Sequence, residues 1–215
     1  NGIIIIESVC DLTIEWLDIS MDSLDSTNSN HAIRIASTSN EGGVTTTIRN
    51  MLIHDKGGNS GSDGPGAIVS AIAGEIDDSW YILNNIIYSL IEGSGGGDSS
   101  SCINMRSYSG NLYIYNNTIY LIKSDGGSKD AVGMRFGNSA ETDANIKNNI
   151  VSGLDGADKN HAYKCDDADA TLNTANNLSD DTADAADDAE DFGQNANDST
   201  ALIGKTLAQI SFVST

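Results

Sequence analysis

Basic side chains recur at intervals in a chain that is otherwise strongly acidic. The chain has 215 residues, and its 31 acidic against 11 basic side chains give a formal net charge of −20 at pH 7. Four basic residues stand at repeating positions in the sequence, and one acidic residue follows the last of them: Arg34, Arg106, Arg135, Lys164 and Asp166. A guanidinium group can bind a uronate or a sulfate with two parallel hydrogen bonds, so these positions suit an acidic sugar. The alternative is that they neutralise the protein's own Asp-rich loops.

Catalysis at these positions would need acids as well as bases. Glycoside hydrolysis uses two carboxylates roughly 5–10 Å apart, and Asp166 is the one clear acid of the set. Further acids would have to come from loops, namely Asp98, Asp125 and Asp130. We therefore expect no catalytic residues. An enzyme alternative, a polysaccharide lyase, would rely on Arg106, Arg135 and Asp166.

Other kinds of chemistry find little support. A chain this acidic does not suit nucleic acid, because phosphate binding needs a basic surface. The sequence contains no run of 18 apolar residues, so we expect no membrane insertion. Cys10, Cys102 and Cys165 are too widely spaced for a zinc site, so no metal site is expected. The acids of segment 180–200 could suit calcium, but no Asp-x-Asp-x-Asp-Gly loop is present. We expect no cofactor and keep calcium as the alternative.

An internal repeat determines how these side chains must be positioned. Copies of one motif begin at Ile14, Ile48, Ile82, Ile114, Ile146 and Thr174. The clearest reads Ile114-Tyr-Asn-Asn-Thr-Ile119, and successive copies are 34, 34, 32, 32 and 28 residues apart. Each contains short strands with period-two alternation and no helical periodicity. Because one repeat cannot bury its own apolar face, the pattern predicts a solenoid whose coils share a core.

A second motif lies midway between these copies and carries the basic residues. Its copies are Ala32–Ile35, Ala67–Ser70, Cys102–Met105, Ala131–Met134 and Ala162–Cys165. Alternation with Ile33 inward predicts an outward column of Arg34, Val69, Asn104, Gly133 and Lys164. The next outward column would be Ala36, Ala71, Arg106, Arg135 and Asp166. On this register Arg106 and Arg135 are one coil apart, with Cα atoms about 4.8 Å apart.

These repeats resemble the right-handed parallel β-helices of the pectate-lyase-like type, over about residues 1–179. The resemblance implies strands named PB1 near 32–36, PB2 near 46–49 and PB3 near 52–54, with equivalents in every coil. It implies that the PB1 face binds acidic sugars, and that an asparagine ladder fills the turn after PB2. The ladder would be Asn50, Asn84, Asn116, Asn148 and Asn176. Asn tolerates the left-handed backbone of such a turn, and Asn116 is expected to be buried.

The expected fold is thus an all-β, right-handed parallel β-helix of about five to six coils with an internal Asn ladder. It would occupy residues 1–179, followed by an acidic loop or linker at 180–200. The apolar segment 201–215 would cap the open end of the helix.

The fold is shared by lyases, hydrolases, phage tailspikes, adhesins and filaments, so it does not decide the function. We expect a non-enzymatic module of an extracellular, cell-surface or virion protein, such as a fibre, spike or filament. Its partners would be polysaccharide, bound at Arg34, Arg106, Arg135 and Lys164, or neighbouring copies of itself. The alternative is a polysaccharide lyase or glycoside hydrolase that acts on an acidic glycan at the PB1 face.

Overall fold

A computed structural model describes most of the repeat region and none of the residues beyond 179. The described residues are 2–6, 11–22, 31–35, 43–56, 66–70, 78–92, 100–105, 110–124, 130–136, 142–156, 160–165 and 171–179. The expected linker at 180–200 and the expected cap at 201–215 therefore lie outside them, as do Arg106 and Asp166.

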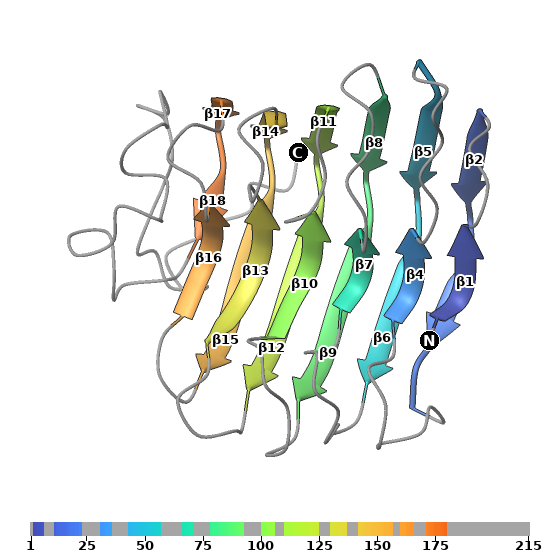
Figure 1. Ribbon diagram of the computed structural model, residues 1–215. Coiled ribbons are helices and arrows are strands. Elements are labelled where there is room, and N and C mark those ends of the chain that lie inside the picture. Colours follow the sequence, from blue (N-terminus) through green and yellow to red (C-terminus); the bar gives the residue numbers. More distant parts are fainter. Residues whose placement is uncertain are drawn as a thin grey trace, which may run out of the picture.

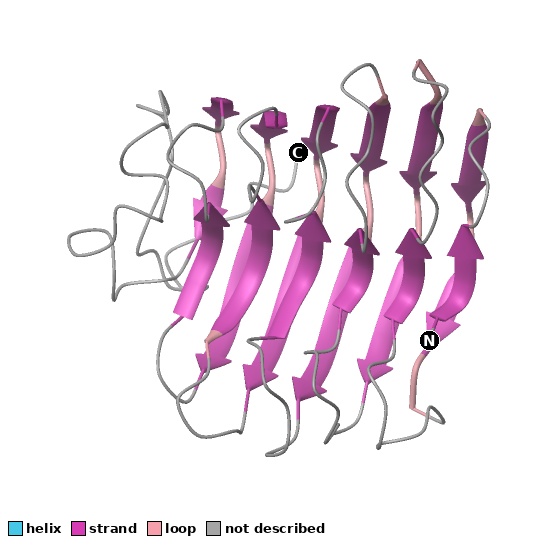
Figure 2. Ribbon diagram, in the orientation of Figure 1, coloured by secondary structure: helices cyan, strands magenta, loops and turns pink. Residues whose placement is uncertain are grey.

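The described chain winds through three parallel sheets, each of six strands (Figure 1). Sheet A contains β1 (Gly2–Ile6), β4 (His31–Ile35), β7 (Gly66–Ser70), β10 (Ser100–Met105), β13 (Ala131–Phe136) and β16 (Asn160–Cys165). Sheet B contains β2 (Leu12–Glu15), β5 (Thr45–Arg49), β8 (Ser79–Leu83), β11 (Gly110–Tyr115), β14 (Thr142–Lys147) and β17 (Thr171–Ala175). Sheet C contains β3 (Asp18–Ser20), β6 (Leu52–Lys56), β9 (Ile86–Glu92), β12 (Thr118–Ser124), β15 (Ile150–Gly156) and β18 (Leu178–Ser179). Each winding gives one strand to every sheet, and all described elements are strands (Figure 2). The all-β parallel solenoid is confirmed.

Columns of isoleucine form the core between the sheets. Ile48, Ile82, Ile114 and Ile146 are in register in sheet B, and all are fully buried. Ile53, Ile87 and Ile119 form the matching column in sheet C and are also fully buried. Burial of one such side chain contributes roughly 1.5–3 kcal/mol. Because each winding adds the same side chain at the same place, neighbouring windings complete one another's core.

Sheets B and C are joined in every winding by a two-residue turn, here called the B–C turn. Its first residue has a positive φ of 55° to 61° in all six windings: Trp16, Asn50, Asn84, Asn116, Asn148 and Asn176. The left-handed backbone expected for the asparagines is confirmed. Their expected burial is wrong: Asn84, Asn116, Asn148 and Asn176 are exposed and Asn50 is half-buried.

The buried ladder is formed by the second residue of the turn, one position later than expected. Its members are Asn85, Asn117, Asn149 and Asn177. The amide of Asn117 donates to the Ile82 carbonyl at 2.9 Å and to Asn149 Oδ1 at 3.0 Å. Asn149 repeats this pattern with Asn177 at 3.0 Å. The left-handed residue turns its own side chain outward, so the next residue faces the interior and its amide pairs buried polar groups.

Candidate functional site

The outer face of sheet A carries the basic residues, but not in the register expected from the sequence. One outward column of sheet A, here called the basic column because three of its five described residues are basic, consists of Arg34, Val69, Asn104, Arg135 and Lys164. Arg135 thus lies between Asn104 and Lys164, and the expected pairing of Arg135 with Arg106 is wrong. Arg34 is three windings from Arg135, roughly 14 Å along the stack. The structure therefore brings Arg135 and Lys164 together and leaves Arg34 apart.

Gly133 fits the position that the observed register, shifted by two residues from the expected one, gives it. It occupies the inward column of small residues otherwise held by Ala32, Ala67, Cys102 and Ala162. A Cβ at Gly133 would lie 2.5 Å from Val151 Cγ1 and 2.6 Å from the Ala162 carbonyl oxygen. Only the residue without a side chain fits there. In this register the motif Ala131–Met134 is displaced by two residues, Met134 is buried, and Arg135 enters the outward column.

One carboxylate already neutralises the cationic end of this column. Asp130 Oδ2 lies 3.1 Å from Lys164 Nζ and 3.5 Å from His161 Nε2. The Asp130 and Lys164 side chains are only 13% and 12% exposed, and His161 is fully buried. Burial strengthens such a pair because water screens it less. Lys164 thus contacts one of the three loop acids named from the sequence; the proposed role of such acids at Arg106 and Arg135 stays a prediction.

The described strands of sheet A contain no aspartate or glutamate. Asp130 precedes β13 and is the acid that the structure places beside the basic column. A glycosidase pair would require a second carboxylate within roughly 10 Å. Asp166, the acid expected from the sequence, lies outside the described residues.

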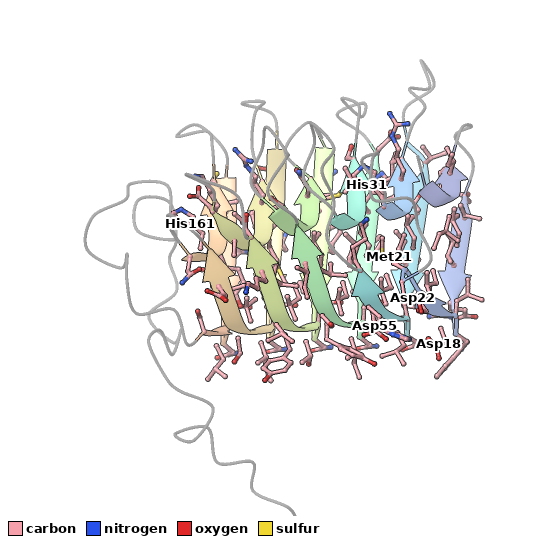
Figure 3. The ribbon with its side chains drawn as sticks, turned by 90° about the horizontal axis from the view of Figure 1, so that it is seen from below. Asp18, Met21, Asp22, His31, Asp55 and His161 are labelled. Carbon is pink, nitrogen blue, oxygen red and sulfur yellow. The ribbon has the colours of Figure 1, made fainter. Side chains whose placement is uncertain are left out.

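A second polar cluster, missed by the sequence analysis, lies on the outer face of sheet C. His54 Nε2 is 2.8 Å from Asp18 Oδ1, and His54 Nδ1 is 2.7 Å from Asp55 Oδ2. The His54 ring also stacks on Tyr88, with ring centroids 5.2 Å apart. The hydrogen bond to Asp55 raises the pKa of His54; burial opposes the shift and Asp18 reinforces it. Asp18 and Asp55 lie near each other at one margin of the molecule, and His31 and His161 lie far apart along the stack (Figure 3).

Three tyrosines form a third surface, on the outer face of sheet B. Tyr81 and Tyr113 are in register and stack with centroids 4.6 Å apart, and Tyr115 meets Tyr113 edge-on at 6.2 Å. Burial, then the neighbouring Tyr113 and Tyr81, raises the pKa of Tyr115. Farther along the column, Asn173 Nδ2 donates to Asn145 Oδ1 at 3.0 Å. The strand alternation already places these residues outward, so the repeat itself could have revealed this surface.

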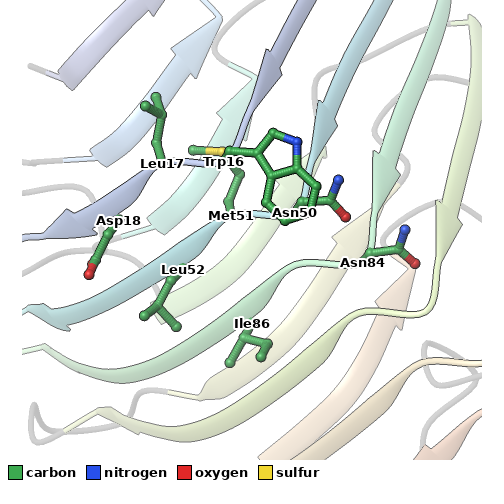
Figure 4. A pocket seen from close by; sticks show the side chains of 8 residues that line it. All are labelled: Trp16, Leu17, Asp18, Asn50, Met51, Leu52, Asn84 and Ile86. Carbon is green, nitrogen blue, oxygen red and sulfur yellow. The ribbon is translucent and has the colours of Figure 1, made fainter.

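An open groove lies at the B–C turns of the first three windings (Figure 4). Its volume is about 410 Å³, and it is lined by Trp16, Leu17, Asp18, Asn50, Met51, Leu52, Asn84 and Ile86. Trp16 is 74% exposed, and Leu17 and Ile86 are also exposed. No sequence motif indicated this groove, because its residues come from three repeats.

Within the described residues, no group of three or more His, Cys, Asp or Glu side chains could hold a metal ion. The acids of 180–200 considered for calcium lie outside them. In the same described part, no helix could span a membrane. No protein family, curated protein or solved structure matches this chain.

Proposed function

We propose that this protein is a non-enzymatic module of an extracellular, cell-surface or virion structural protein, and that it contacts carbohydrate. We further propose that its solenoid is the right-handed, pectate-lyase-like β-helix that the repeats resemble. A rigid stack of windings suits a spacer in a fibre, spike or filament, because every winding is held by its neighbours.

The observation that carries the non-enzymatic part of the proposal is the contact between Lys164 and Asp130. Asp130, the carboxylate that contacts the basic column among the described residues, is already bound to a cation at 3.1 Å. Its charge therefore stabilises the protein itself, and it has no second acid beside it among the described residues of sheet A. Proton transfer to a leaving group and attack by water would need two such groups in different environments.

The carbohydrate part of the proposal is supported by the aromatic side chains on the outer faces. Tyr81, Tyr113 and Tyr115 gather on sheet B, and Trp16 is exposed at the B–C turn. Aromatic rings offer rigid, partly apolar area at low entropic cost, and amides or hydroxyls beside them can orient a polar ligand.

The proposal is tested by measuring binding and turnover on the same polysaccharides. The protein would be incubated with acidic and neutral polysaccharides, and both retention and the release of unsaturated or reducing-end products would be followed. We expect binding without product. Product formation that disappears in Arg135→Ala plus Lys164→Ala, but persists in the distant variant Lys147→Ala, would establish the enzyme alternative instead.

A further inference from the structure

Trp16 departs from the rule that every other winding follows at the B–C turn. In the other five windings the left-handed first position holds asparagine, whereas the first winding holds tryptophan with φ of 61°. Asparagine tolerates this backbone better than other residues with a side chain, and bulky residues are genuine outliers there. The indole is 74% exposed, so burial in the described fold does not account for it. Residues held in strained backbone cluster at functional sites, which makes Trp16 a candidate for a binding role.

The groove beside Trp16 combines apolar area with a few polar groups. Leu17, Leu52 and Ile86 supply apolar lining, and Asn50 and Asn84 supply carboxamides. The amide of Asn84 is held by Asn116, whose Nδ2 donates to Asn84 Oδ1 at 3.1 Å. The parallel stack therefore fixes the groove lining in position before any ligand arrives.

Asp18 contributes a carboxylate to the same groove. One of its oxygens accepts from His54 at 2.8 Å, while the side chain as a whole is 69% exposed. The bond to His54 holds the carboxylate in place, and its exposure allows a further hydrogen bond to a ligand hydroxyl. An exposed carboxylate is a strong acceptor of hydroxyl hydrogens.

This set of groups matches a sugar ring better than other small molecules. A pyranose has an apolar C–H face, which can lie on an indole, and equatorial hydroxyls, which can reach amide and carboxylate groups. The surroundings are acidic: Asp18 and Asp55 flank His54, and the whole chain carries a formal charge of −20. A field of this sign repels uronates and sulfates, so charge favours an uncharged sugar.

We propose that the groove at Trp16 is a binding subsite for one neutral pyranose unit of a polysaccharide. This inference rests on the proposed contact with carbohydrate, and it names the sugar class and the residues. The site differs from the basic column of sheet A, where an acidic glycan was expected. It places Trp16 as the ring-stacking residue for that unit, with Asn50 of the next winding beside it to orient its hydroxyls. Asp18 and Asn84 are two windings apart, roughly 10 Å along the stack, so they would contact hydroxyls of neighbouring sugar units.

Tryptophan fluorescence tests the subsite directly, because the chain has only two tryptophans and the other, Trp80, is 5% exposed. In a Trp80→Phe variant, the emission reports Trp16 alone. Neutral hexasaccharides of glucose, mannose and galactose would be titrated, with hexagalacturonate as the charged comparison. We expect one of the neutral series to shift the emission to shorter wavelength and to protect Trp16 from quenching by acrylamide.

Substitutions then separate stacking from general effects on the surface. We expect Trp16→Ala, measured by calorimetry, to weaken binding about tenfold or more, as loss of an aromatic anchor commonly does. Trp16→Phe should retain part of the affinity. Tyr120→Ala, which removes an exposed aromatic residue of sheet C outside the groove, should leave the affinity unchanged.

The results that would overturn the subsite are distinct from failure of the proposed function. Neutral glycan binding that is unchanged in Trp16→Ala, or binding of hexagalacturonate alone, would overturn the subsite and leave the carbohydrate-binding module standing. An emission shift that follows protein concentration without sugar would assign the groove to a second copy of the chain. Absence of binding to any glycan would remove the carbohydrate contact itself.

Discussion

Asn117 Oδ1 accepts two hydrogen bonds from Asn85, one from the backbone N at 3.0 Å and one from the side-chain Nδ2 at 2.9 Å. The two residues belong to successive windings, 32 positions apart, and both are fully buried. The same bonds recur from Asn117 to Asn149 and from Asn149 to Asn177. Each asparagine is therefore both donor and acceptor, and the turn of one winding is tied to the turn of the next.

The first prediction concerns this ladder. Asn117→Leu removes the bonds to Ile82 and Asn149 and leaves two donors of Asn85 buried without their acceptor. Because each unsatisfied buried group costs about 1–3 kcal/mol, we expect unfolding free energy to fall by roughly 2–5 kcal/mol. Urea denaturation measures this free energy of unfolding.

The neighbouring residue provides the control for the ladder. Asn116 is exposed and has a φ of 58°, which glycine adopts without strain. Asn116→Gly should therefore change the unfolding free energy by less than about 1 kcal/mol. A loss at Asn116→Gly as large as that at Asn117→Leu would contradict the assignment of the ladder to the second residue of the turn.

The second prediction concerns the strained Trp16. Trp16→Asn places the residue used by the other five windings at the same left-handed backbone position. Little burial is lost, because the indole is 74% exposed. We expect a gain in stability of about 1 kcal/mol, seen as a higher urea midpoint, because asparagine tolerates this backbone better.

Trp16→Phe keeps an aromatic residue at the strained position and should show no such gain. A lower midpoint for Trp16→Asn would mean that the indole stabilises the first winding, and that strain gives no argument for a binding role.

The third prediction concerns pH. In the folded protein His54 donates to both Asp55 and Asp18, which requires the protonated ring and raises its pKa above the ordinary 6.5. A raised folded-state pKa gives stability that is fully present below the unfolded-state pKa and is lost as the pH rises through the folded-state value. We expect urea midpoints to decrease across that interval.

His54→Gln should remove this part of the pH dependence, because glutamine does not titrate. Resonances of the His54 ring, followed by NMR, should titrate above 6.5 in the wild type and move back toward it in Asp55→Asn. Titration of His54 below 6.5 would show that burial outweighs the two carboxylates.

The fourth prediction concerns Gly133, where the observed register of β13 leaves no room for a side chain. Gly133→Ala puts a Cβ within 2.5 Å of Val151 Cγ1 and 2.6 Å of the Ala162 carbonyl oxygen. Such overpacking costs about 1–3 kcal/mol, because side chains and backbone must shift. Thermal unfolding should show the loss.

Adding Val151→Ala to Gly133→Ala relieves one of the two contacts. The methyl groups of Val151 are removed, whereas the carbonyl of Ala162 belongs to the backbone and remains. The Val151 change alone creates a cavity, so the double variant should lose less than the two single losses added together. Strict additivity would show that Gly133 and Val151 do not share a tight space.

Much of the fold was determined by the sequence alone. The repeated Ile-x-Asn motif predicted parallel strands in stacked windings, because a residue at the same place in each repeat must lie above its equivalent. Ile48, Ile82, Ile114 and Ile146 lie in register as that argument requires. The left-handed turn was also predictable, since asparagine is among the few residues with a side chain that adopt it readily.

The tertiary structure decided which of two adjacent asparagines faces the core. Asn84 and Asn85 have the same chemistry, and a single left-handed residue reverses the alternation between them. Leu17 and Met51, the apolar residues at the second position of the first two turns, are the local sign in the sequence that this position faces inward. Composition alone could not separate the two.

The tertiary structure also decided which side chains of neighbouring windings are adjacent on the outer faces of the sheets. Repeat lengths vary between 28 and 34 residues, so a motif can shift by two positions and keep its alternation. The space at Gly133, which depends on Val151 in another strand, has no room for a side chain in the observed register, and in that register Arg135 lies outside the expected column. The Trp16 groove arose in the same way, from residues of three windings that no single segment contains. Period and turn chemistry are properties of a local segment, whereas register and surface sites depend on packing between segments far apart in the chain.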